Sequence, residues 1–225
     1  MKLTLVIVSD THGQHRQLNL PKGDVLIHCG DILSGPLLNQ SHILVDFNNW
    51  LGTQKFKHKL VIAGNHDHLL GRVEYADVYR GVLSNCHYLQ DESVVINGVK
   101  FYGSPWTPDF FPEHWVFNQP RGSEVTQARW AQIPDDTNVL ITHGPPQGVM
   151  DVCRDIHDSS RMVRVGCSAL RQRISHLNQL KLHAFGHIHE GRGTHEEGGV
   201  KYVNAASLDG RYRQNNPNYT VVVLD

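Results

Sequence analysis

The segment K-L-T-L-V-I-V-S-D-T-H, residues 2–12, joins an apolar run directly to a short polar loop. Val- and Ile-rich runs of this length, bounded by polar residues, predict buried β-strands. Four further runs end in the same way, so that the five are KLTLVIV before Asp10 and His12, DVLIHCG before Asp31, KLVIAG before Asn65 and His66, NVLIT before His143, and KLHAFG before His187 and His189. Because chemistry in open α/β sheets gathers beyond the carboxyl ends of the strands, we expect these loops to form one site.

The polar residues in these loops offer carboxylate, amide and imidazole groups but no thiolate. The candidate ligands are Asp10, His12, Asp31, Asn65, His143, His187 and His189. This mixture suits Mn²⁺, with Fe or Zn²⁺ as alternatives, better than the all-oxygen sites of Mg²⁺ or Ca²⁺. Seven ligands are too many for one tetrahedral ion but suit two ions that share a carboxylate. Two dications outweigh the two Asp charges, and the remaining positive charge favours a phosphate ester as substrate.

The composition places the chain among ordinary globular proteins. It has 225 residues, of which 40% are hydrophobic and 19% charged, and residues 1–225 are expected to form a single domain. The formal net charge of −1 provides no overall field that would attract long nucleic acid or an anionic membrane. We therefore expect neither as a partner, and any anionic substrate must be attracted by a local charge. The oligomeric state is not indicated.

The cysteines and the first residues favour a cytoplasmic protein. Cys29, Cys86, Cys153 and Cys167 form no C-x-x-C pair, which argues against a zinc ribbon or a thioredoxin-like motif. Scattered cysteines in a chain of this size are typical of reduced cytosolic proteins. The apolar start at 3–8 is too short for a signal sequence, and no run approaches the ~20 apolar residues of a membrane span.

Strand and helix patterns alternate and then give way to hairpins. We expect helices over 41–51 with Ser41 as the cap, over 68–80, over 123–130 with Ser123 as the cap, and near 168–177. Asn97-Gly98 predicts a hairpin between strands at 93–96 and 100–102, and later strands are expected at 138–142, 182–185, 200–204 and 220–224. This order predicts an α/β fold in which two packed, mixed β-sheets are flanked by helices. The order of the strands within the sheets is not predicted.

Five short motifs carry a resemblance to a known family. They are D-T-H at 10–12, G-D at 30–31, G-N-H-D at 64–67, T-H-G-P-P at 142–146 and G-H-I-H at 186–189. In this order they resemble the calcineurin-like metallophosphoesterase superfamily and span most of the chain. The flanking segments H-C-G-D, Y-G-S-P-W, F-N-Q-P-R-G and Y-V-N-A-A-S are similar to its metallophosphoesterase-domain-containing, UPF0046-like group. The resemblance implies a four-layer αββα sandwich.

The resemblance also implies roles for the loop residues. Asp10, His12 and His189 would bind one metal, Asn65, His143 and His187 the other, and Asp31 would bridge them. A hydroxide between the metals would attack phosphorus in line with the leaving oxygen. His66 would not be a ligand: it would act beside the metals on a phosphoryl oxygen or the leaving group, oriented by Asp67. The implied activity is phosphodiester hydrolysis, with 2′,3′-cyclic nucleotides among the substrates.

Substrate contacts are expected from the aromatic, proline-rich segment 103–122, read as a long ordered loop, and from the polar segment 149–165, read as a mobile lid. Trp106 is the preferred candidate for stacking on a nucleobase, at about 1–3 kcal/mol per base, and Arg121 and Arg164 are candidates for binding phosphate. The alternative for most of the aromatic residues is packing against the core. The aromatic residues of this segment are Trp106, Phe110, Phe111, Trp115 and Phe117.

Two other functions remain open at this point. A phosphomonoesterase acting on nucleotides or phosphoproteins would use the same metal ligands. A non-catalytic scaffold of the same fold would have lost metal binding, although the complete ligand set argues against it. A serine hydrolase is not supported, because the sequence contains no G-x-S-x-G motif.

Overall fold

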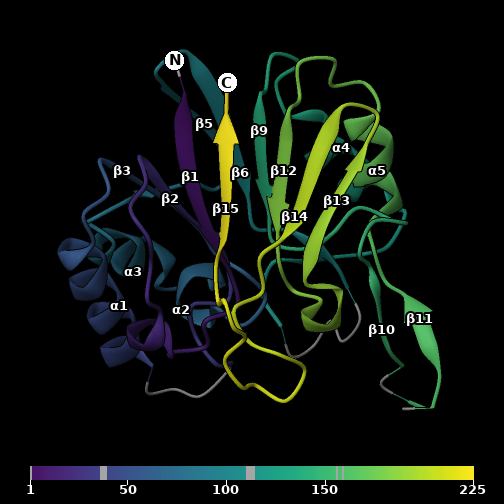
Figure 1. Cartoon of the computed structure of the whole chain (residues 1–225). Helices are drawn as coiled ribbons and strands as arrows, with labels where there is room; N and C mark the ends of the chain where they lie inside the picture. Colours follow the sequence, from purple (N-terminus) through teal and green to yellow (C-terminus); the bar gives the residue numbers. More distant parts are fainter. Residues whose placement is uncertain (1, 36–39, 110–114, 156, 159) are drawn as a thin grey trace.

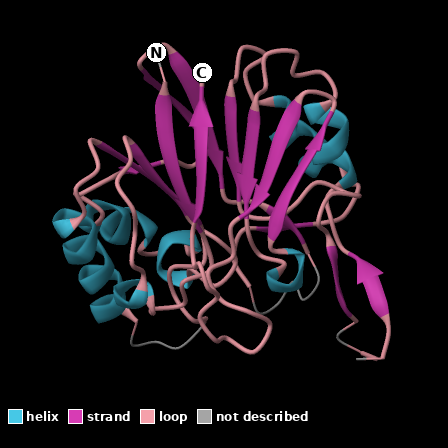
Figure 2. Cartoon of the chain, in the orientation of Figure 1, coloured by secondary structure: helices cyan, strands magenta, loops and turns pink. Residues whose placement is uncertain are grey.

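The structure is a computed structural model that describes residues 2–35, 40–109, 115–155, 157–158 and 160–225 (Figure 1). Two large sheets pack face to face, and helices cover the outer face of each (Figure 2). This arrangement confirms the expected fold class. None of the described helices combines the length and the apolar character that crossing a bilayer requires.

The first sheet is mainly parallel. Its strands follow the order β15 (Thr220–Leu224), β1 (Leu3–Val8), β2 (Val25–Cys29), β3 (His58–Ile62) and β4 (His87–Tyr88). Strands β1 to β4 run parallel, while β15 pairs antiparallel with β1. The carboxyl ends of β1, β2 and β3 therefore lie next to one another at one edge.

The second sheet is mixed. Its strands follow the order β13 (Gly193–Glu197), β14 (Val200–Asn204), β12 (Leu182–Phe185), β9 (Val139–Thr142), β6 (Val99–Ser104) and β5 (Glu92–Ile96). The four inner strands are parallel and the two outer ones antiparallel. The predicted hairpin is present, with Asn97 and Gly98 at φ values of 51° and 80° between β5 and β6.

Side-chain alternation along the strands separates the core into layers. In β1, Leu5 and Ile7 face the interior between the sheets, whereas Val6 and Val8 face the helical layer, and all four are fully buried. Burying one such side chain stabilises the fold by about 1.5–3 kcal/mol. A strand buried on both faces explains why the run reads as continuously apolar.

The helices lie on the outer faces. The first sheet is covered by α1 (Ser41–Thr53), α2 (His68–Gly71) and α3 (Ala76–Val82), and the second by α4 (Glu124–Ala131) and α5 (Ser168–Ile174). Ser123 caps α4 as predicted, because its side chain accepts a hydrogen bond from Thr126 N–H.

Two helix predictions were wrong in detail. Ser41 is the first helical residue rather than the cap; Gln40 takes the cap position, and its side chain accepts from Ser34 N–H instead of capping the helix. The single helix expected over 68–80 is two helices, because Arg72 has an extended backbone between α2 and α3. The α2 helix ends at Gly71, where a Cβ would come within 2.7 Å of Val116.

Short strands occupy the two segments that were expected to contact substrate. Segment 103–122 contains the end of β6 and the pair β7 (Thr107–Pro108) and β8 (Asn118–Gln119), so it is not only a loop. Segment 149–165 forms an antiparallel ribbon of β10 (Val152–Arg154) and β11 (Met162–Arg164), which projects beside the second sheet (Figure 1). We call this the 152–164 ribbon.

Candidate metal centre

The five predicted loops meet at one end of the two sheets. Asp10, Asp31 and Asn65 follow β1, β2 and β3, which are neighbours in the first sheet. His143 and His187 follow β9 and β12, which are neighbours in the second sheet. Because both sets of strands are parallel and point to the same edge, the fold brings together residues that lie far apart in the sequence.

Hydrogen bonds tie the loops of one sheet to those of the other. His187 N–H donates to both carboxylate oxygens of Asp10, at 3.0 and 3.1 Å, and His143 Nδ1 donates to Cys29 O at 2.9 Å. The loops approach so closely that a Cβ at Gly186 would collide with Asp10 Oδ2. Glycine at this position therefore allows the two sheets to share one site.

The candidate ligand atoms form three overlapping groups, and the atoms within each group lie within 4.8 Å of one another. These groups are Asp10, His12 and His189; His12, Asp31 and His66; and Asp31, His143 and His187. The first and third correspond to the predicted division between two metals. Asp31 belongs to the second and third groups and His12 to the first and second, so the three groups form one continuous set that runs through Asp31. Asn65 Oδ1 lies 2.9 Å from His143 Nε2, beside the third group.

Four of the seven predicted ligands have left-handed backbone conformations. The φ values are 54° at Asp10, 42° at His12, 56° at Asp31 and 67° at His187. Such conformations cost on the order of 1–3 kcal/mol each in residues other than glycine, and they concentrate at functional sites. The loops are therefore held in strained conformations at the residues whose side chains form the site.

Three imidazoles are oriented in the same way. His12 Nδ1 donates to Leu33 O, His143 Nδ1 to Cys29 O, and His189 Nδ1 to Asp209 O, each at 2.9 Å. Each Nε2 then faces a carboxylate oxygen, at 3.9 Å, 3.2 Å and 3.5 Å respectively. A carbonyl partner that fixes the tautomer and frees Nε2 is the usual arrangement of a metal-binding histidine.

The buried carboxylates require positive charge nearby. Burial alone would raise the pKa of Asp31, but the charges of His143 and His66 lower it well below its usual range. Burial likewise opposes ionisation of Asp10, while the hydrogen bond and charge of His189 lower its pKa. In the imidazoles, burial is outweighed by these carboxylates, which raise the pKa of His143 and of His189 to about 9. The protonated imidazoles thus balance the negative charge of these carboxylates, as bound divalent cations would.

The residues present fit a pair of divalent cations. His12 Nε2, which can ligate a metal, is buried and has no hydrogen-bond partner among the described residues. Asp10, His12 and His189 would hold one ion, and Asn65, His143 and His187 the other, with Asp31 between them. The donor set is oxygen and imidazole nitrogen throughout, which suits a first-row transition metal.

Asp67 does not form the predicted pair with His66. Its two carboxylate oxygens accept from the backbone N–H groups of Leu33 and Gly64, each at 2.8 Å, and no hydrogen bond joins it to His66 in the part of the chain that the structure describes. Burial and the charge of Asp31 raise the pKa of Asp67 to about 7. Asp67 therefore braces the loops after β2 and β3, because each of its oxygens holds one of them.

His66 instead contacts Asp31 and an aromatic residue. Its backbone N–H donates to Asp31 Oδ1 at 2.9 Å, and its Nε2 lies 3.9 Å from Asp31 Oδ2. The imidazole packs against Trp115, with ring centroids 4.2 Å apart and the ring planes tilted by 38°. His66 thus faces the same space as the predicted ligands, and by distance alone it would count as a further candidate ligand.

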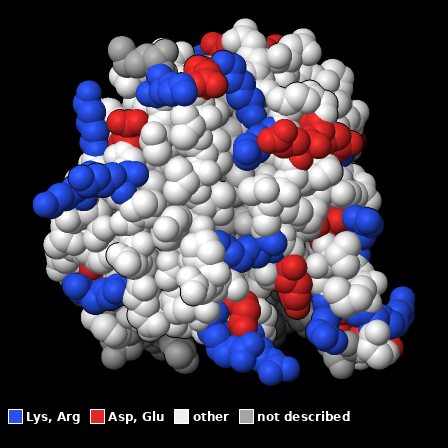
Figure 3. All heavy atoms as spheres, in the orientation of Figure 1, with Lys and Arg blue, Asp and Glu red and all other residues white. Residues whose placement is uncertain are grey.

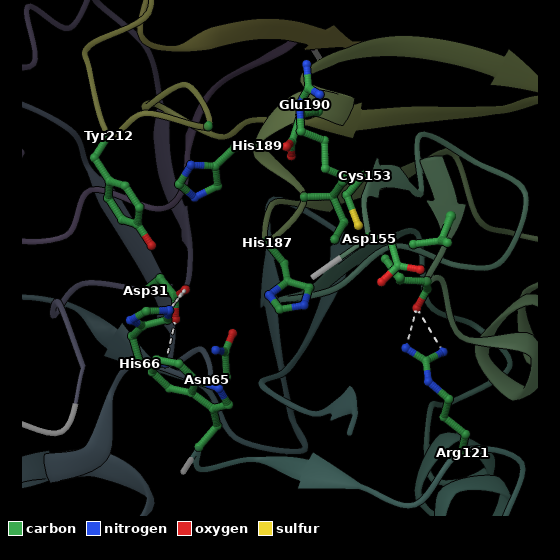
Figure 4. A pocket seen from close by; sticks show the side chains of 16 residues that line it. Asp31, Asn65, His66, Arg121, Cys153, Asp155, His187, His189, Glu190 and Tyr212 are labelled. Carbon is green, nitrogen blue, oxygen red and sulfur yellow. Dashed lines mark hydrogen bonds and ion pairs between the residues drawn. The ribbon is translucent and has the colours of Figure 1, made fainter. Parts of the chain in front are cut away.

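A cavity of about 480 Å³ opens above these residues (Figure 4). Its floor consists of Asp31, Asn65, His66, His187 and His189. The 152–164 ribbon and its flank contribute one wall, and the aromatic side chains of Trp115 and Tyr212 line other parts of it. The remaining polar lining is balanced in charge, with the side chains of Arg121, Arg154, Asp155 and Glu190.

Of the three predicted substrate contacts, one lines the cavity and two do not. Arg121 lines the cavity, but its guanidinium donates to the carbonyl oxygens of Asp109 and Val165. Trp106 and Arg164 are not among the cavity residues. The Trp106 indole N–H donates to Asp91, and Arg164 donates to Asp151 Oδ1 at 2.7 Å.

The aromatic packing explains why Trp106 lies outside the cavity. Its ring packs against Phe117, and the Arg129 guanidinium lies over it, 4.3 Å from the ring centroid. This agrees with the alternative of core packing for these two aromatic residues. Phe110 and Phe111 lie outside the described residues. Among the aromatic candidates that the structure describes, Trp115 is the one that lines the cavity.

Tyr212 and the acidic residues of the cavity were not identified from the sequence. Tyr212 lies in the segment between β14 and β15, beyond the motifs. Asp155 and Glu190 follow β10 and His189, respectively, and no local pattern distinguishes Asp155 from a surface acid. The adjacency of Glu190 to His189 is the one signal that could have indicated a cavity residue.

Comparisons with known proteins agree with this geometry. The profile of the calcineurin-like phosphoesterase family matches residues 3–191. The chain is 38% identical to human metallophosphoesterase domain-containing protein 1 over 233 residues, which cover 94% of this chain and 68% of the relative. It is 37% identical to a UPF0046 protein of Caenorhabditis elegans, covering 92% of this chain and 70% of that protein.

Solved structures show the same fold at low sequence identity. A phosphopantetheinyl hydrolase from Mycobacterium tuberculosis has a TM-score of 0.65 at 16% identity, covering 97% of this chain and 95% of that one. A putative 5′-nucleotidase from Staphylococcus aureus has a TM-score of 0.60 at 14% identity and covers all of this chain and 51% of that one. Because the family profile spans most of the sequence and the relatives align over nearly its whole length, the chain belongs to the calcineurin-like phosphoesterase family and is a phosphoester hydrolase.

Proposed function

We propose that the chain is a dinuclear-metal phosphodiesterase that hydrolyses small phosphodiesters, with 2′,3′-cyclic nucleotides as the first class to test. The observation that carries the proposal is the arrangement around Asp31. This carboxylate is shared by two groups of candidate ligands, and three nearby imidazoles turn Nε2 toward carboxylates while Nδ1 donates to a carbonyl. Such a layout suits two cations with one bridging ligand.

The cavity supports a diester rather than a monoester. Beyond the candidate ligands, the two arginines in its lining are matched by two acids, so the lining offers no surplus positive charge for a second phosphate charge. Val163, Val165 and Ile188 also line it and give one side an apolar surface. A phosphodiester carries one negative charge and a second organic substituent, and both properties match this lining.

The cations and His66 would have separate tasks. Bound divalent metals supply positive charge for the phosphoryl oxygens and an activated water as nucleophile. His66 is placed at the floor of the cavity, beside Asp31, where it is within reach of a phosphoryl oxygen or the leaving oxygen. A positioned histidine that donates a proton to the leaving oxygen typically raises the rate by about 10²–10⁴-fold.

The remaining parts of the proposal concern the metal, the location and the partners. Mn²⁺ is the proposed metal, with Fe and Zn²⁺ as alternatives, because the ligands combine carboxylate, amide and imidazole. A cytoplasmic location is supported by Cys29, Cys86, Cys153 and Cys167, which are all free thiols. Long nucleic acid is not proposed as a substrate: on the face shown in Figure 3, basic and acidic side chains are interspersed and form no continuous basic band.

The substrate class is tested with Mn²⁺-reconstituted protein. We expect a higher kcat/KM for bis-p-nitrophenyl phosphate than for p-nitrophenyl phosphate, and turnover of 2′,3′-cyclic nucleotides in a parallel comparison with 3′,5′-cyclic nucleotides. The Asp31→Asn variant, prepared in the same way, controls for contaminating phosphatases. Faster hydrolysis of the monoester by the wild-type protein would overturn the diesterase assignment, whereas inactivity on both esters with bound metal would overturn the enzymatic role.

A further inference from the structure

Tyr212 occupies an unusual backbone position at the edge of the candidate metal centre. Its φ is 58°, in the left-handed region that bulky residues other than glycine seldom adopt. The conformation is held from several sides: Tyr212 N–H donates to Asp209 O at 2.8 Å, and Gln14 Nε2 donates to Tyr212 O at 3.2 Å. Strain that the surrounding contacts maintain is typical of functional residues.

Asp209 lies in the same turn as Tyr212 and also orients a predicted metal ligand. Asp209 Oδ1 accepts from the backbone N–H groups of Arg211 and Arg213, at 2.8 and 3.0 Å. Asp209 O accepts from His189 Nδ1 as well as from Tyr212 N–H. One short turn therefore orients His189 and sets the position of the Tyr212 side chain.

This backbone directs the Tyr212 ring over two predicted ligands of the same metal. Its centroid lies 4.9 Å from that of His12 and 5.4 Å from that of His189, with interplanar angles of 62° in both cases. The side chain lines the cavity, and its hydroxyl points into it toward Asp31 (Figure 4). No hydrogen bond to this hydroxyl is made by the residues that the structure describes.

A phenol in this position is suited to bind a phosphoryl oxygen. Its hydroxyl is protonated at neutral pH and can donate one hydrogen bond. His66 also packs against His12, with the two ring centroids 4.7 Å apart, and His66 and Tyr212 both line the cavity that contains Asp31. A phosphoryl group above Asp31 would therefore lie between His66 and the Tyr212 hydroxyl.

We propose that Tyr212 is a substrate-contacting residue whose hydroxyl donates a hydrogen bond to a non-bridging oxygen of the phosphoryl group. The inference rests on the phosphoester hydrolysis described above but not on the preference for diesters. A hydrogen bond to a charged acceptor contributes about 1.5–3 kcal/mol, which corresponds to roughly 10- to 100-fold in an equilibrium or rate constant.

The test compares Tyr212→Phe with Tyr79→Phe, which removes the hydroxyl of a tyrosine on α3 that packs against Tyr75. Both variants are loaded with Mn²⁺; their metal content and thermal midpoint are measured, and binding of inorganic phosphate is followed by calorimetry. We expect Tyr212→Phe to keep its metal and thermal midpoint, to bind phosphate roughly 10- to 100-fold more weakly, and to lose a similar factor in kcat/KM. Tyr79→Phe should match the wild type.

Unchanged phosphate affinity in Tyr212→Phe would overturn the proposal, because the hydroxyl would then make no contact with phosphate and Tyr212 would serve only through the packing of its ring. Loss of metal from Tyr212→Phe would also overturn it and would assign the hydroxyl to the metal site. If the wild-type protein hydrolyses the monoester faster than the diester but Tyr212→Phe still weakens phosphate binding, the Tyr212 proposal holds and the proposed diesterase function fails.

Discussion

At the scale of single residues, Asp31 has the largest number of roles. Its carboxylate accepts from His66 N–H and lies 3.2 Å from His143 Nε2. Its backbone is left-handed, and a Cβ at Gly64 would collide with its Oδ1. The carboxylate is therefore held against both sheets, and it belongs to two of the three groups of candidate ligands.

Replacing Asp31 should remove metal and activity together. Asp31→Asn keeps the shape of the side chain but removes the charge that would hold two cations. We expect metal content, measured by plasma mass spectrometry after reconstitution with Mn²⁺, and phosphodiester hydrolysis to fall in parallel. Asp46→Asn, which loses a carboxylate that pairs with Arg16 at the surface, is the control and should retain both. An Asp31→Asn protein that still binds two ions would contradict the bridging role.

Replacing His66 should separate catalysis from metal binding. His66→Gln keeps a polar side chain but cannot transfer a proton, so we expect normal Mn²⁺ content and a kcat lowered by about 10²–10⁴-fold. His42→Gln, on the exposed side of α1, serves as the matched control. Loss of metal from His66→Gln would instead make His66 a ligand, as its distance from Asp31 and His12 alone would allow.

Asp67 should matter for stability. Its oxygens accept from Leu33 N–H and Gly64 N–H, and an amide in its place would turn a donor toward one of them. We expect Asp67→Asn to lower the free energy of unfolding by about 1–3 kcal/mol in urea titrations. Asp24→Asn, where an exposed carboxylate accepts from Thr4 N–H, should cost less. A shifted pH–rate profile at unchanged stability would instead favour the pair with His66.

At the scale of elements, strand ends were predictable and their connections were not. The run before Asp10 is apolar on both faces because β1 is buried between a sheet and a helical layer, so its period and its end are visible in the sequence. The two strands of the 152–164 ribbon have only three residues each, and Arg154, Met162 and Arg164 are exposed, so these strands carry no such signal. Its contribution to the cavity wall follows from tertiary packing alone.

One role that the family resemblance implied is not found in the structure. The resemblance pairs His66 with Asp67, but the turn sends the two side chains to different partners. Tyr212 shows the reverse: nothing in its local sequence marks it, and only a left-handed turn between β14 and β15 places it over His12 and His189. Long-range contacts of this kind leave no periodic pattern to read.

The pairing of β12 with β9 includes a buried histidine that should make stability depend on pH. Thr142 Oγ1 donates to Gly144 O, so it accepts from His183 Nε2–H at 2.8 Å. Burial lowers the pKa of His183 to about 3. Between about pH 6.5 and pH 3 the unfolded chain binds a proton at this residue and the folded chain does not, so stability falls as pH falls through this window.

A His183→Gln variant measures this contribution. At about pH 5.5, one unit below the unfolded pKa, the wild type should have lost roughly 1.4 kcal/mol through His183 relative to about pH 7.5, and the variant should not show this loss. Urea unfolding of both proteins without metal, at both pH values, gives the difference directly. Equal losses in wild type and variant would show that His183 is protonated in the folded state.

At the scale of the whole molecule, the two sheets act as two halves of one site. Each sheet alone presents only part of the ligand set: the first contributes Asp10, His12, Asp31 and Asn65, and the second contributes His143, His187 and His189. The core between the sheets, which includes Leu5, Ile7, Ile141 and Ala184, therefore sets the spacing of the candidate ligands as well as the stability of the fold. Under the proposed function, substrate selection is expected from the 152–164 ribbon, Trp115 and Tyr212, which line the cavity around this edge.

The central claim is that this shared edge binds two cations bridged by Asp31. The most direct measurement is anomalous diffraction from crystals of the Mn²⁺-reconstituted protein. We predict two peaks about 3.5–4 Å apart, one beside Asp10, His12 and His189 and the other beside Asn65, His143 and His187, with Asp31 in contact with both. A single peak, or two peaks that Asp31 does not join, would contradict the claim.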